Sequence, residues 1–473
     1  MKLQGSLLRL FPLLLVAGCS VGPHYKTPCA KLPEKFAAQA NDKSIGQLAQ
    51  WWKFFEDPCL DTLIEKALSS NYDLKIAIER IEETRATYQI ERAKLFPQID
   101  ATGAINRQEV SRDLIQNNLA STLKNRFNYF QAGFDALWEL DFWGKQRHAR
   151  DALYAGYEAQ IESMRDVRII LISDVARAYT RIRSLQKQLA LLAHKITIDT
   201  RLLQLTRDRL HSGVDSALPD LEQIMALEDS KNEAILAQTQ YQQIMNSLAT
   251  LLGENPEDWL KSAEGHCMCE DVRYRIPQTT KVLEAGLPSE LLKRRPDIRQ
   301  AERLYAAAVE RVGQAVADEF PNFSLVSSVA TEANKSHDWF STGSLSWLVG
   351  PAFRWPLITF GRIRFNIEAK KSVQRQALLT YAQTIIKALE DVENTLIAYF
   401  EEHERVRVLT SKLCAATIER DLIAGKFTSG LSSELDFLFA EKNRLDITLE
   451  LTSAQESAST ATIAVYKALG GGW

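Results

Sequence analysis

The chain has 473 residues, of which 45% are hydrophobic and 25% charged, with 21 glycines and 14 prolines. This composition excludes a collagen-like or low-complexity chain and leaves enough apolar side chains for a buried core. A net charge of −3 without any basic block argues against nucleic acid as a partner. The mean hydropathy of −0.20 is too low for a polytopic helical membrane protein. Length alone suggests about three domains of ~150 residues, but long stretches almost free of glycine and proline favour long helices.

The N-terminus has the pattern of a secretion signal. Lys2 and Arg9 give a positive start, and residues 10–16 form an apolar run well short of the ~20 residues that a spanning helix needs. The run ends in Val16-Ala17-Gly18-Cys19, which resembles a bacterial lipobox. We therefore expect residues 1–18 to be removed, Cys19 to carry a diacylglycerol, and residues 19–57 to form a lipidated stub. Ser20, where aspartate would hold a lipoprotein at the inner membrane, implies sorting to the outer membrane; a plain signal peptide with an incidental cysteine is the alternative.

The remaining cysteines do not indicate a disulfide framework or a metal site. Their number is odd and their spacing irregular: Cys29, Cys59, Cys267, Cys269 and Cys414. The run His266-Cys267-Met268-Cys269 lacks a second pair of ligands at a usable spacing. Loop thiols or a local disulfide are the favoured interpretation, and no cofactor is expected apart from the covalent lipid on Cys19.

The two halves of the chain align with each other at fixed offsets in residue number. Pairs at an offset of 217 include Trp138 with Trp355, Gly144 with Gly361, Asp174 with Asp391, Gly213 with Gly430 and Gly253 with Gly470. Further upstream the offset is 224, as for Asp73 with Asp297 and Pro97 with Pro321. So many pairs in register predict a duplicated unit. The repeats are residues 58–253 and 286–473, joined by a linker over 254–285.

Each repeat has the same predicted order of parts. A first helix, over about 58–95 or 287–319, is ended by Pro97 or Pro321. Two extended segments follow. A very long helix then begins after a glycine and ends at a second glycine, where the chain turns; a returning helix ends at a third. These glycines are Gly144, Gly213 and Gly253 in the first repeat and Gly361, Gly430 and Gly470 in the second.

The extended segments have the period of two that is typical of strands with one apolar face. We predict strands over about 97–107, 128–141, 321–330 and 344–358. Strands of ~10 residues with aromatic residues near their ends are used by outer-membrane β-barrels, although a soluble hairpin packed on helices is the alternative. Four strands cannot close a barrel in lipid, where open edges are forbidden. A membrane-spanning sheet therefore requires several chains, in a number that this geometry does not give.

The long helices have the period of a coiled coil. In the first repeat, apolar residues alternate by spacings of four and three: Leu171, Val175, Ala178, Ile182, Leu185, Leu189, Leu192 and Ile196. The mean of 3.5 predicts a left-handed supercoil, and the stretch from Lys145 to Ser212 would give ~100 Å of helix. The second repeat keeps the pattern less regularly from Leu389 to Val406, with His403 expected to be a packed seam residue rather than a metal ligand.

This duplicated order of parts resembles the TolC-like outer-membrane efflux proteins, in particular the lipoprotein branch that includes OprM and NodT. The resemblance covers nearly the whole mature chain. Its most specific segments are residues 19–28 (CSVGPHYKTP), 294–298 (RRPDI), 356–361 (PLITFG) and 465–473 (VYKALGGGW).

The resemblance implies an α+β membrane protein that is a homotrimer. Three chains would form a twelve-stranded β-barrel in the outer membrane of a Gram-negative bacterium, continued into the periplasm by an α-barrel of twelve helices. The implied partners are outer-membrane lipid, a periplasmic adaptor and an inner-membrane pump of the resistance–nodulation–division (RND) type. The channel itself would be a passive duct, with the energy supplied by the pump.

The resemblance also implies two functional regions. The adaptor would contact the helical turns, each a glycine followed by an aliphatic residue: Gly213-Val214 and Gly430-Leu431. Beyond the second turn, Leu435 and Asp436 match residues that narrow the tunnel, while Phe439 stands where the family commonly has a second carboxylate. That departure makes the constriction more apolar. A ring of three Asp436 side chains would select against anions, but Asp436 could instead cap its helix or pair locally.

Other classes of function have less support. There is no phosphate-binding loop, zinc spacing or nucleophile elbow, so the sequence does not predict an enzyme. A lipid-anchored coiled-coil spacer of the envelope would explain the helices but not the four strands. A channel for type I protein secretion would share the fold, and the lipobox with the C-terminal segment favours efflux over it.

Overall fold

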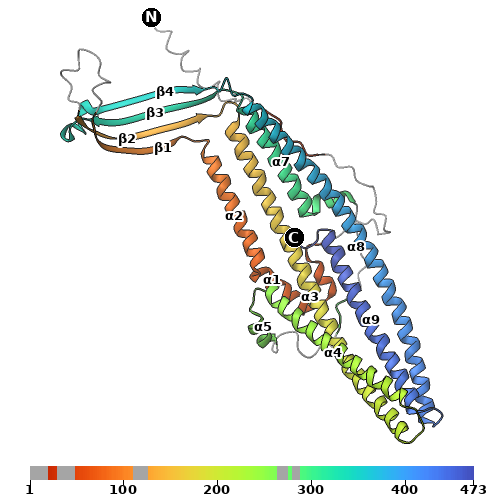
Figure 1. Ribbon diagram of the computed structural model, residues 1–473. Helices are drawn as coiled ribbons and strands as arrows, with labels where there is room; N and C mark the ends of the chain where they lie inside the picture. Colours follow the sequence, from red (N-terminus) through yellow and green to blue (C-terminus); the bar gives the residue numbers. More distant parts are fainter. Residues whose placement is uncertain (1–19, 29–47, 110–125, 264–274, 280–287) are drawn as a thin grey trace. The chain divides into compact units, whose positions relative to one another are not determined.

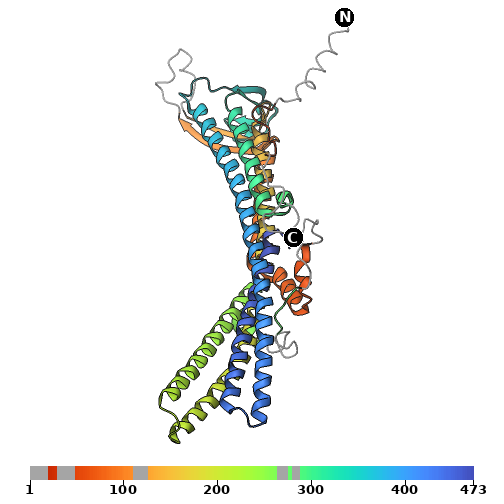
Figure 2. The same ribbon diagram turned by 90° about the vertical axis from the view of Figure 1, so that its right-hand side faces the viewer.

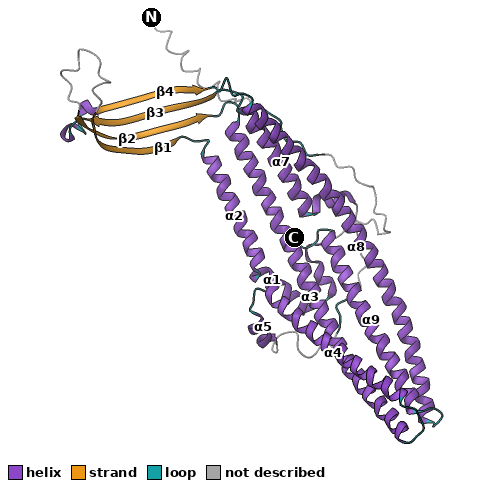
Figure 3. Cartoon of the chain, viewed as in Figure 1, coloured by secondary structure: helices purple, strands orange, loops and turns teal. Residues whose placement is uncertain are grey.

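A computed structural model describes residues 20–28, 48–109, 126–263, 275–279 and 288–473. The signal segment and Cys19, Cys29, Cys267 and Cys269 lie outside these ranges. The chain divides into two compact units: residues 1–29, 80–160 and 300–381 in unit 1, and residues 30–79, 161–299 and 382–473 in unit 2. Each unit contains matching parts of both repeats, so a repeat is not a compact domain of its own. In the described part the strands form one sheet and helices make up most of the rest (Figure 3).

The sheet of unit 1 contains the four predicted strands. They are β1 (Gln98–Glu109), β2 (Arg126–Leu140), β3 (Asn322–Ala333) and β4 (Leu345–Arg354). All neighbours are antiparallel, in the order β1-β2-β3-β4 (Figure 1). The predicted end of the last strand at residue 358 is wrong, because β4 stops at Arg354. Pro356 follows shortly afterwards and has no N–H for a ladder hydrogen bond.

The register places apolar side chains on one face of the sheet. Phe134 lies opposite Val329, which lies opposite Trp347 on the next strand. These side chains have no covering layer in the described part of the chain; Trp347, for example, is 72% exposed. On the other face Asp100 lies directly opposite Asp135, a like-charge pair that is tolerated where water screens it. The predicted period of two is therefore present, with an exposed apolar face and a polar face on the other side of the sheet.

The long helices repeat with the predicted offset. Helices α3 (Lys145–His211) and α8 (Arg362–Thr428) have 67 residues each, and the offset of 217 relates both their starts and their ends. The returning helices are α4 (Leu218–Leu251) and α9 (Glu434–Ala468). In unit 2, α3 with α4 and α8 with α9 form two hairpins (Figure 2). None of the helices in the described ranges is both long and apolar enough to cross a membrane.

The coiled-coil seam predicted on the long helices is buried in unit 2. On α3, Val175, Ile182 and Leu185 have no exposed surface. On α8, Val392 and Leu396 are equally buried, whereas His403 is only partly covered. His403 lies on the Tyr399 ring, and its Nδ1 donates to the Tyr399 carbonyl 2.8 Å away. The ring is thus a seam residue, as expected.

The first helix of each repeat is broken, which corrects the prediction of single helices over 58–95 and 287–319. The first repeat has α1 (Pro58–Ser70) and α2 (Tyr72–Ala93), and the second has α6 (Pro288–Arg294) and α7 (Pro296–Ala317). The linker region contributes the short α5 (Pro256–Ala263), and the stub contributes a 3-10 helix over Leu48–Phe55. The breaks fall at Asn71 and Arg295, which are equivalent positions under the upstream offset of 224.

Each break is held by the end of the returning helix from the same repeat. Asn71 Nδ2 donates to the Leu251 carbonyl (2.9 Å), and Arg295 Nη1 donates to the Ala468 carbonyl (2.9 Å). These two acceptors are equivalent under the offset of 217. The chain then turns at Gly253 or Gly470, both with positive φ, against the backbone of the break. A Cβ at Gly253 would lie 2.6 Å from the Ser70 carbonyl oxygen. The repeat has therefore duplicated a long-range contact as well as its elements.

Candidate functional site

The two helical turns have the same backbone structure. Gly213 and Gly430 have φ near +70°. In the first turn the Gly213 N–H donates to the Leu210 carbonyl and the Val214 N–H to the Arg209 carbonyl. The second turn has both bonds at the equivalent positions. This is a Schellman motif, in which a residue with positive φ satisfies the last carbonyls of the helix. No atom lies within 4 Å of a Cβ built on either glycine, so the backbone conformation, rather than crowding, favours glycine here.

The aliphatic residue after each glycine projects into solvent. Val214 is 65% exposed and Leu431 is 80% exposed. At the first turn Arg209 pairs with Asp215 (2.7 Å), and this ion pair holds the pKa of the carboxyl below its usual range. The second turn has Lys426 and Ser432 at the equivalent positions. The two turns thus share an exposed apolar tip but differ in charge.

The residue predicted as the leucine of the constriction already has contacts within the chain. Leu435 is half-buried and packs against a cluster formed by Ile198 and Leu202 of α3 with Leu445 of α9. One turn further on, Phe439 is 46% exposed. The structure therefore brings Leu435 into the α3–α9 contact and leaves Phe439 available for a neighbour.

Asp436 forms the local cap that the sequence offered as one of two roles. Its Oδ2 accepts from the Ser433 N–H (3.0 Å) and Oγ (2.7 Å), while its own N–H donates to Ser433 Oγ (3.1 Å). Ser432 Oγ donates to the same carboxylate oxygen (3.0 Å). These hydrogen bonds, that from the Ser433 hydroxyl first, lower the pKa of Asp436. The side chain is exposed, so its charge faces solvent at the start of α9.

A buried ionic network near the turns was missed by the sequence reading. Asp199 of α3 is fully buried. It accepts from Lys442 Nζ of α9 (2.6 Å) and from Ser230 Oγ of α4 (2.6 Å). A lone aspartate in a charged helix gives no local signal of burial. Its place in the 3.5-residue pattern, three residues beyond Ile196, was the only available hint.

The structure also shows what the N-terminal motif contacts in unit 1. His148 of α3 lies between Glu310 of α7 (Nδ1 to Oε2, 2.6 Å) and the stub, where its Nε2 is 2.9 Å from the Val21 carbonyl oxygen. Ser20 Oγ lies 2.8 Å from the same Nε2. The hydrogen bond to Glu310 raises the pKa of His148. His148 thus attaches Ser20 and Val21, the residues that directly follow Cys19.

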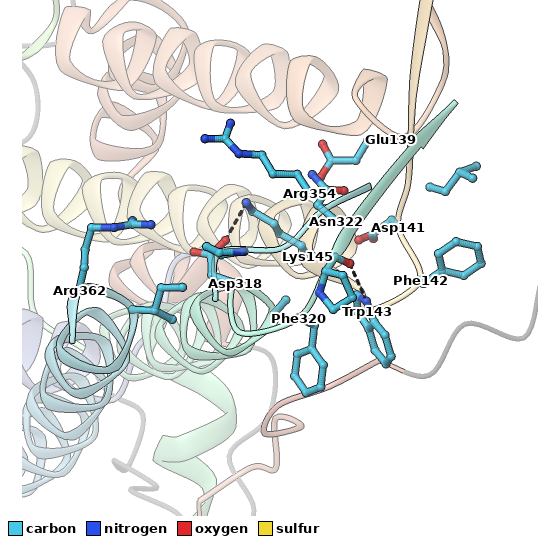
Figure 4. A pocket seen from close by; sticks show the side chains of 15 residues that line it. Glu139, Asp141, Phe142, Trp143, Lys145, Asp318, Phe320, Asn322, Arg354 and Arg362 are labelled. Atoms are coloured by element: carbon cyan, nitrogen blue, oxygen red, sulfur yellow. Dashed lines mark hydrogen bonds and ion pairs between the residues drawn. The ribbon is translucent and has the colours of Figure 1, made fainter. Parts of the chain in front are cut away.

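A cavity of about 410 Å³ lies in unit 1 where strands and helices meet (Figure 4). Its lining includes the end of β2, the start of α3 and the end of β4, with charged groups of both signs. Lys145 Nζ pairs with Asp318 (2.7 Å), and Trp143 Nε1 donates to the Pro321 carbonyl (2.9 Å). These contacts connect the segment between β2 and α3 to the segment between α7 and β3. The cavity is therefore part of the connection between strands and helices in unit 1.

Comparison with known proteins gives consistent matches over nearly the whole chain. The profile of the "Outer membrane efflux protein" family matches residues 63–254 and 287–471. The toluene efflux pump outer membrane protein TtgC of Pseudomonas putida is 30% identical over 467 residues, covering 97% of this chain and 94% of TtgC. The cation efflux system protein CusC of Escherichia coli is 28% identical, covering 97% of both. The solved outer-membrane channel OprN superposes with a TM-score of 0.82 at 28% identity, covering 96% of this chain and all of OprN.

The cap at the second turn gives a pH-dependent prediction. The pKa of Asp436 is lowered in the fold, so its contribution is complete above the ordinary aspartate pKa and is lost as the pH falls through the lower, folded value. Ser433→Ala removes the two hydrogen bonds of the Ser433 hydroxyl, one from the Asp436 N–H and one to Asp436 Oδ2, and should cost about 1 kcal/mol locally, or roughly five-fold faster amide exchange around residues 433–437 at neutral pH.

Hydrogen exchange followed by mass spectrometry measures this effect. Ser432→Ala is the matched control, because Ser432 donates only one additional bond, and it should change exchange much less. The difference between wild type and Ser433→Ala should shrink as the pH falls through the folded pKa of Asp436, which lies below the ordinary aspartate value. A difference that stays unchanged throughout this acid range would contradict a carboxylate-dependent cap.

Proposed function

This chain belongs to the outer membrane efflux protein family, and on that basis we propose that three copies of it form the exit duct of a tripartite efflux system. It is the outer-membrane component of an efflux pump. The observation that carries the trimeric duct is the sheet: four strands with a bare apolar face and two open edges.

The open edges favour closure with further copies. β1 and β4 each have one neighbour in the sheet, so each leaves a row of backbone N–H and C=O groups unpaired. In hydrocarbon every such group has to be satisfied, and only a closed barrel does this with strands. Pairing β4 of one chain with β1 of the next removes both edges. Three chains would give twelve strands, with the Trp347 face toward lipid and the Asp100 face toward water.

The helical turns are the proposed contact with the adaptor. Val214 and Leu431 are small apolar tips presented on rigid Schellman turns, and they have no covering partner in the described part of the chain. An apolar side chain held in this way can enter a groove of a partner helix pair at low entropic cost. We propose that the periplasmic adaptor contacts Gly213-Val214 and Gly430-Leu431, and that the adaptor in turn binds an inner-membrane RND pump.

The start of α9 is the proposed constriction. Three Asp436 carboxylates around an axis would favour cations over anions, while three Phe439 rings would make the opening less polar. Because Leu435 contributes to the α3–α9 contact, opening would have to disturb that contact. We propose that Leu435 supports the closed state and that Asp436 supplies its charge.

Cargo selection does not follow from the duct. TtgC is described as part of a toluene pump and CusC as part of a cation system, at nearly the same identity to this chain. One architecture thus accompanies very different cargoes. We propose that adaptor and pump select the exported compound and that this subunit is a passive channel with no catalytic role.

The lipid anchor is proposed from the lipobox alone. The residues that follow Cys19 are held by His148, whose Nε2 contacts Ser20 Oγ and the Val21 carbonyl oxygen. Cys19→Ser should abolish incorporation of labelled palmitate, while trimers still assemble through the strands. Retained label on the Cys19→Ser protein would contradict lipidation at this residue.

The duct is tested by assembly and conductance. The purified protein should have the mass of a trimer and should give small, mostly closed conductances in planar bilayers. Asp436→Ala should weaken the preference for cations and alter the closed state, whereas Asp215→Ala, at the other turn, should leave conductance unchanged. A correctly inserted oligomer that never conducts would overturn the proposal.

The partners are tested by cross-linking in cells. A photoreactive amino acid at Leu431 should capture an adaptor and, with it, an RND pump. The same group at exposed Ile90 on α2 is the control for non-specific capture. Recovery of an ATP-driven protein exporter instead would favour type I secretion, and labelling no stronger than at Ile90 would contradict the assignment of the tip.

A further inference from the structure

We propose that α4 of one copy packs against α8 of the next copy as α9 packs against α3 within one chain, and that Asp229 pairs with Lys412 across this interface. The proposal rests on the trimeric duct proposed above and specifies how its helical part is joined. The partner of these two helix faces is a second copy of this chain.

One ion pair recurs at equivalent positions in the two helical hairpins of unit 2. Lys195 of α3 pairs with Glu233 of α4 (3.3 Å). Adding 217 to both numbers gives Lys412 of α8 and Glu450 of α9, which pair at 3.0 Å. At this position the sequence offset also relates side-chain contacts, and we use it to transfer contacts from one hairpin to the other.

Within one chain the hairpins meet through α3 and α9. Four ion pairs join these helices in the described residues: Lys195–Asp446, Asp199–Lys442, Arg181–Glu456 and Arg201–Glu434. By the offset, α3 corresponds to α8, and α9 corresponds to α4. The transferred contact lies between α8 and α4, at the two outer edges of the pair of hairpins. In a closed ring these edges meet between neighbouring copies.

At the positions of α8 and α4 that correspond to the four α3–α9 ion pairs, the two charges of a pair are either both kept or both lost. Lys195 and Asp446 correspond to Lys412 and Asp229, so both charges are kept. In the other three pairs both charges are lost, and the corresponding residues are Ala416 with Met225, Ala398 with Thr239, and Ile418 with Ala217. No pair keeps one charge without the other. An isolated charge is costly in a contact, so paired retention and paired loss are expected if α8 and α4 face each other.

The buried network around Asp199 is replaced by apolar residues at all three equivalent positions. Asp199, Lys442 and Ser230 are joined by hydrogen bonds within the chain. Their equivalents are Ala416, Met225 and Ile447, all apolar. Ala416 and Ile447 are already buried, whereas Met225 is 60% exposed. Met225 of a neighbouring copy would complete this apolar set, as Lys442 completes the polar one.

The apolar contacts transfer as well. Leu191, Leu435 and Leu438 pack on the α3–α9 cluster within the chain. Their equivalents are Val408, Leu218 and Leu221, which are 54%, 62% and 54% exposed. Side chains that pack in the α3–α9 contact thus have equivalents on α8 and α4 that are exposed to solvent. A second copy placed by the repeat would cover them.

One ion pair then remains to be formed. Lys412 pairs with Glu450 in its own hairpin, as Lys195 pairs with Glu233, but Lys195 has a second carboxylate, Asp446. The equivalent of Asp446 is Asp229, which is exposed and has no ion pair among the described residues. Asp229 of one copy is therefore the missing second partner of Lys412 in the next.

Cysteine cross-linking between two differently tagged chains tests the interface. Asp229→Cys is placed in one chain and Lys412→Cys in the other, with Cys29, Cys59, Cys267, Cys269 and Cys414 replaced by alanine. After co-expression, a short bismaleimide should link the two tags into a covalent dimer. The repeat supplies the matched control: Lys195→Cys and Asp446→Cys should cross-link when both are in one chain and should not link two chains.

The unmodified sequence provides a second measurement. A carbodiimide joins a carboxylate and an amine that are in direct contact, so it should couple Asp229 to Lys412. In oligomers mixed from ¹⁴N and ¹⁵N chains, the coupled peptides should include hybrids of the two isotopes, whereas coupled Lys195 and Asp446 should remain unmixed.

The outcomes separate this inference from the proposed function. Trimers that conduct but show neither the cysteine link nor the isotope hybrid would overturn the α4–α8 interface and leave the duct intact. Linking of the Lys195 and Asp446 positions between chains would overturn it too, because the two contacts would have exchanged places. Absence of any oligomer would refute both proposals.

Discussion

A sheet of four strands cannot satisfy its own backbone in a membrane, and the rest of this protein is arranged around that constraint. Both outer strands leave a row of polar groups unpaired, and in hydrocarbon each such group costs several kcal/mol. The bare apolar face of the sheet, with Trp347 largely exposed, has no covering layer in the described part of the chain. Both features are consistent with lipid on one side of the sheet and further copies at its edges.

The duplication provides the second organising principle. Each repeat contributes two strands, a broken first helix and a hairpin of one long and one returning helix. The contacts repeat together with the elements, as Asn71 with Leu251 and Arg295 with Ala468 show. A duplicated unit with one kind of hairpin contact can form a ring from several chains. The contact seen once inside the chain is then needed again between chains, and the chemistry of α4 and α8 agrees with it.

The sequence predicted elements well where the signal was local and periodic. Strand alternation, the glycines at helix starts and turns, and the buried seam of α3 all follow from neighbours a few residues apart. It failed at Asn71, because that break is held by the carbonyl of Leu251, far along the chain. Asp436 remained ambiguous for the opposite reason. Its cap is local and readable as Ser433 followed three residues later by an acid, but its position around an axis depends on other chains.

By itself, therefore, the amino-acid sequence determined the duplication, the order of strands and helices, the turns at Gly213 and Gly430, and the family to which the chain belongs. These properties depend on periodicity and backbone conformation, which short stretches of chain encode. Only the tertiary structure decided which charges are paired and which are left without partners. Asp199 and Asp229 look alike in the sequence, yet Asp199 is buried and paired with Lys442, whereas Asp229 is exposed. That difference arises because burial and pairing depend on residues far apart in the chain, which meet only when the helices pack.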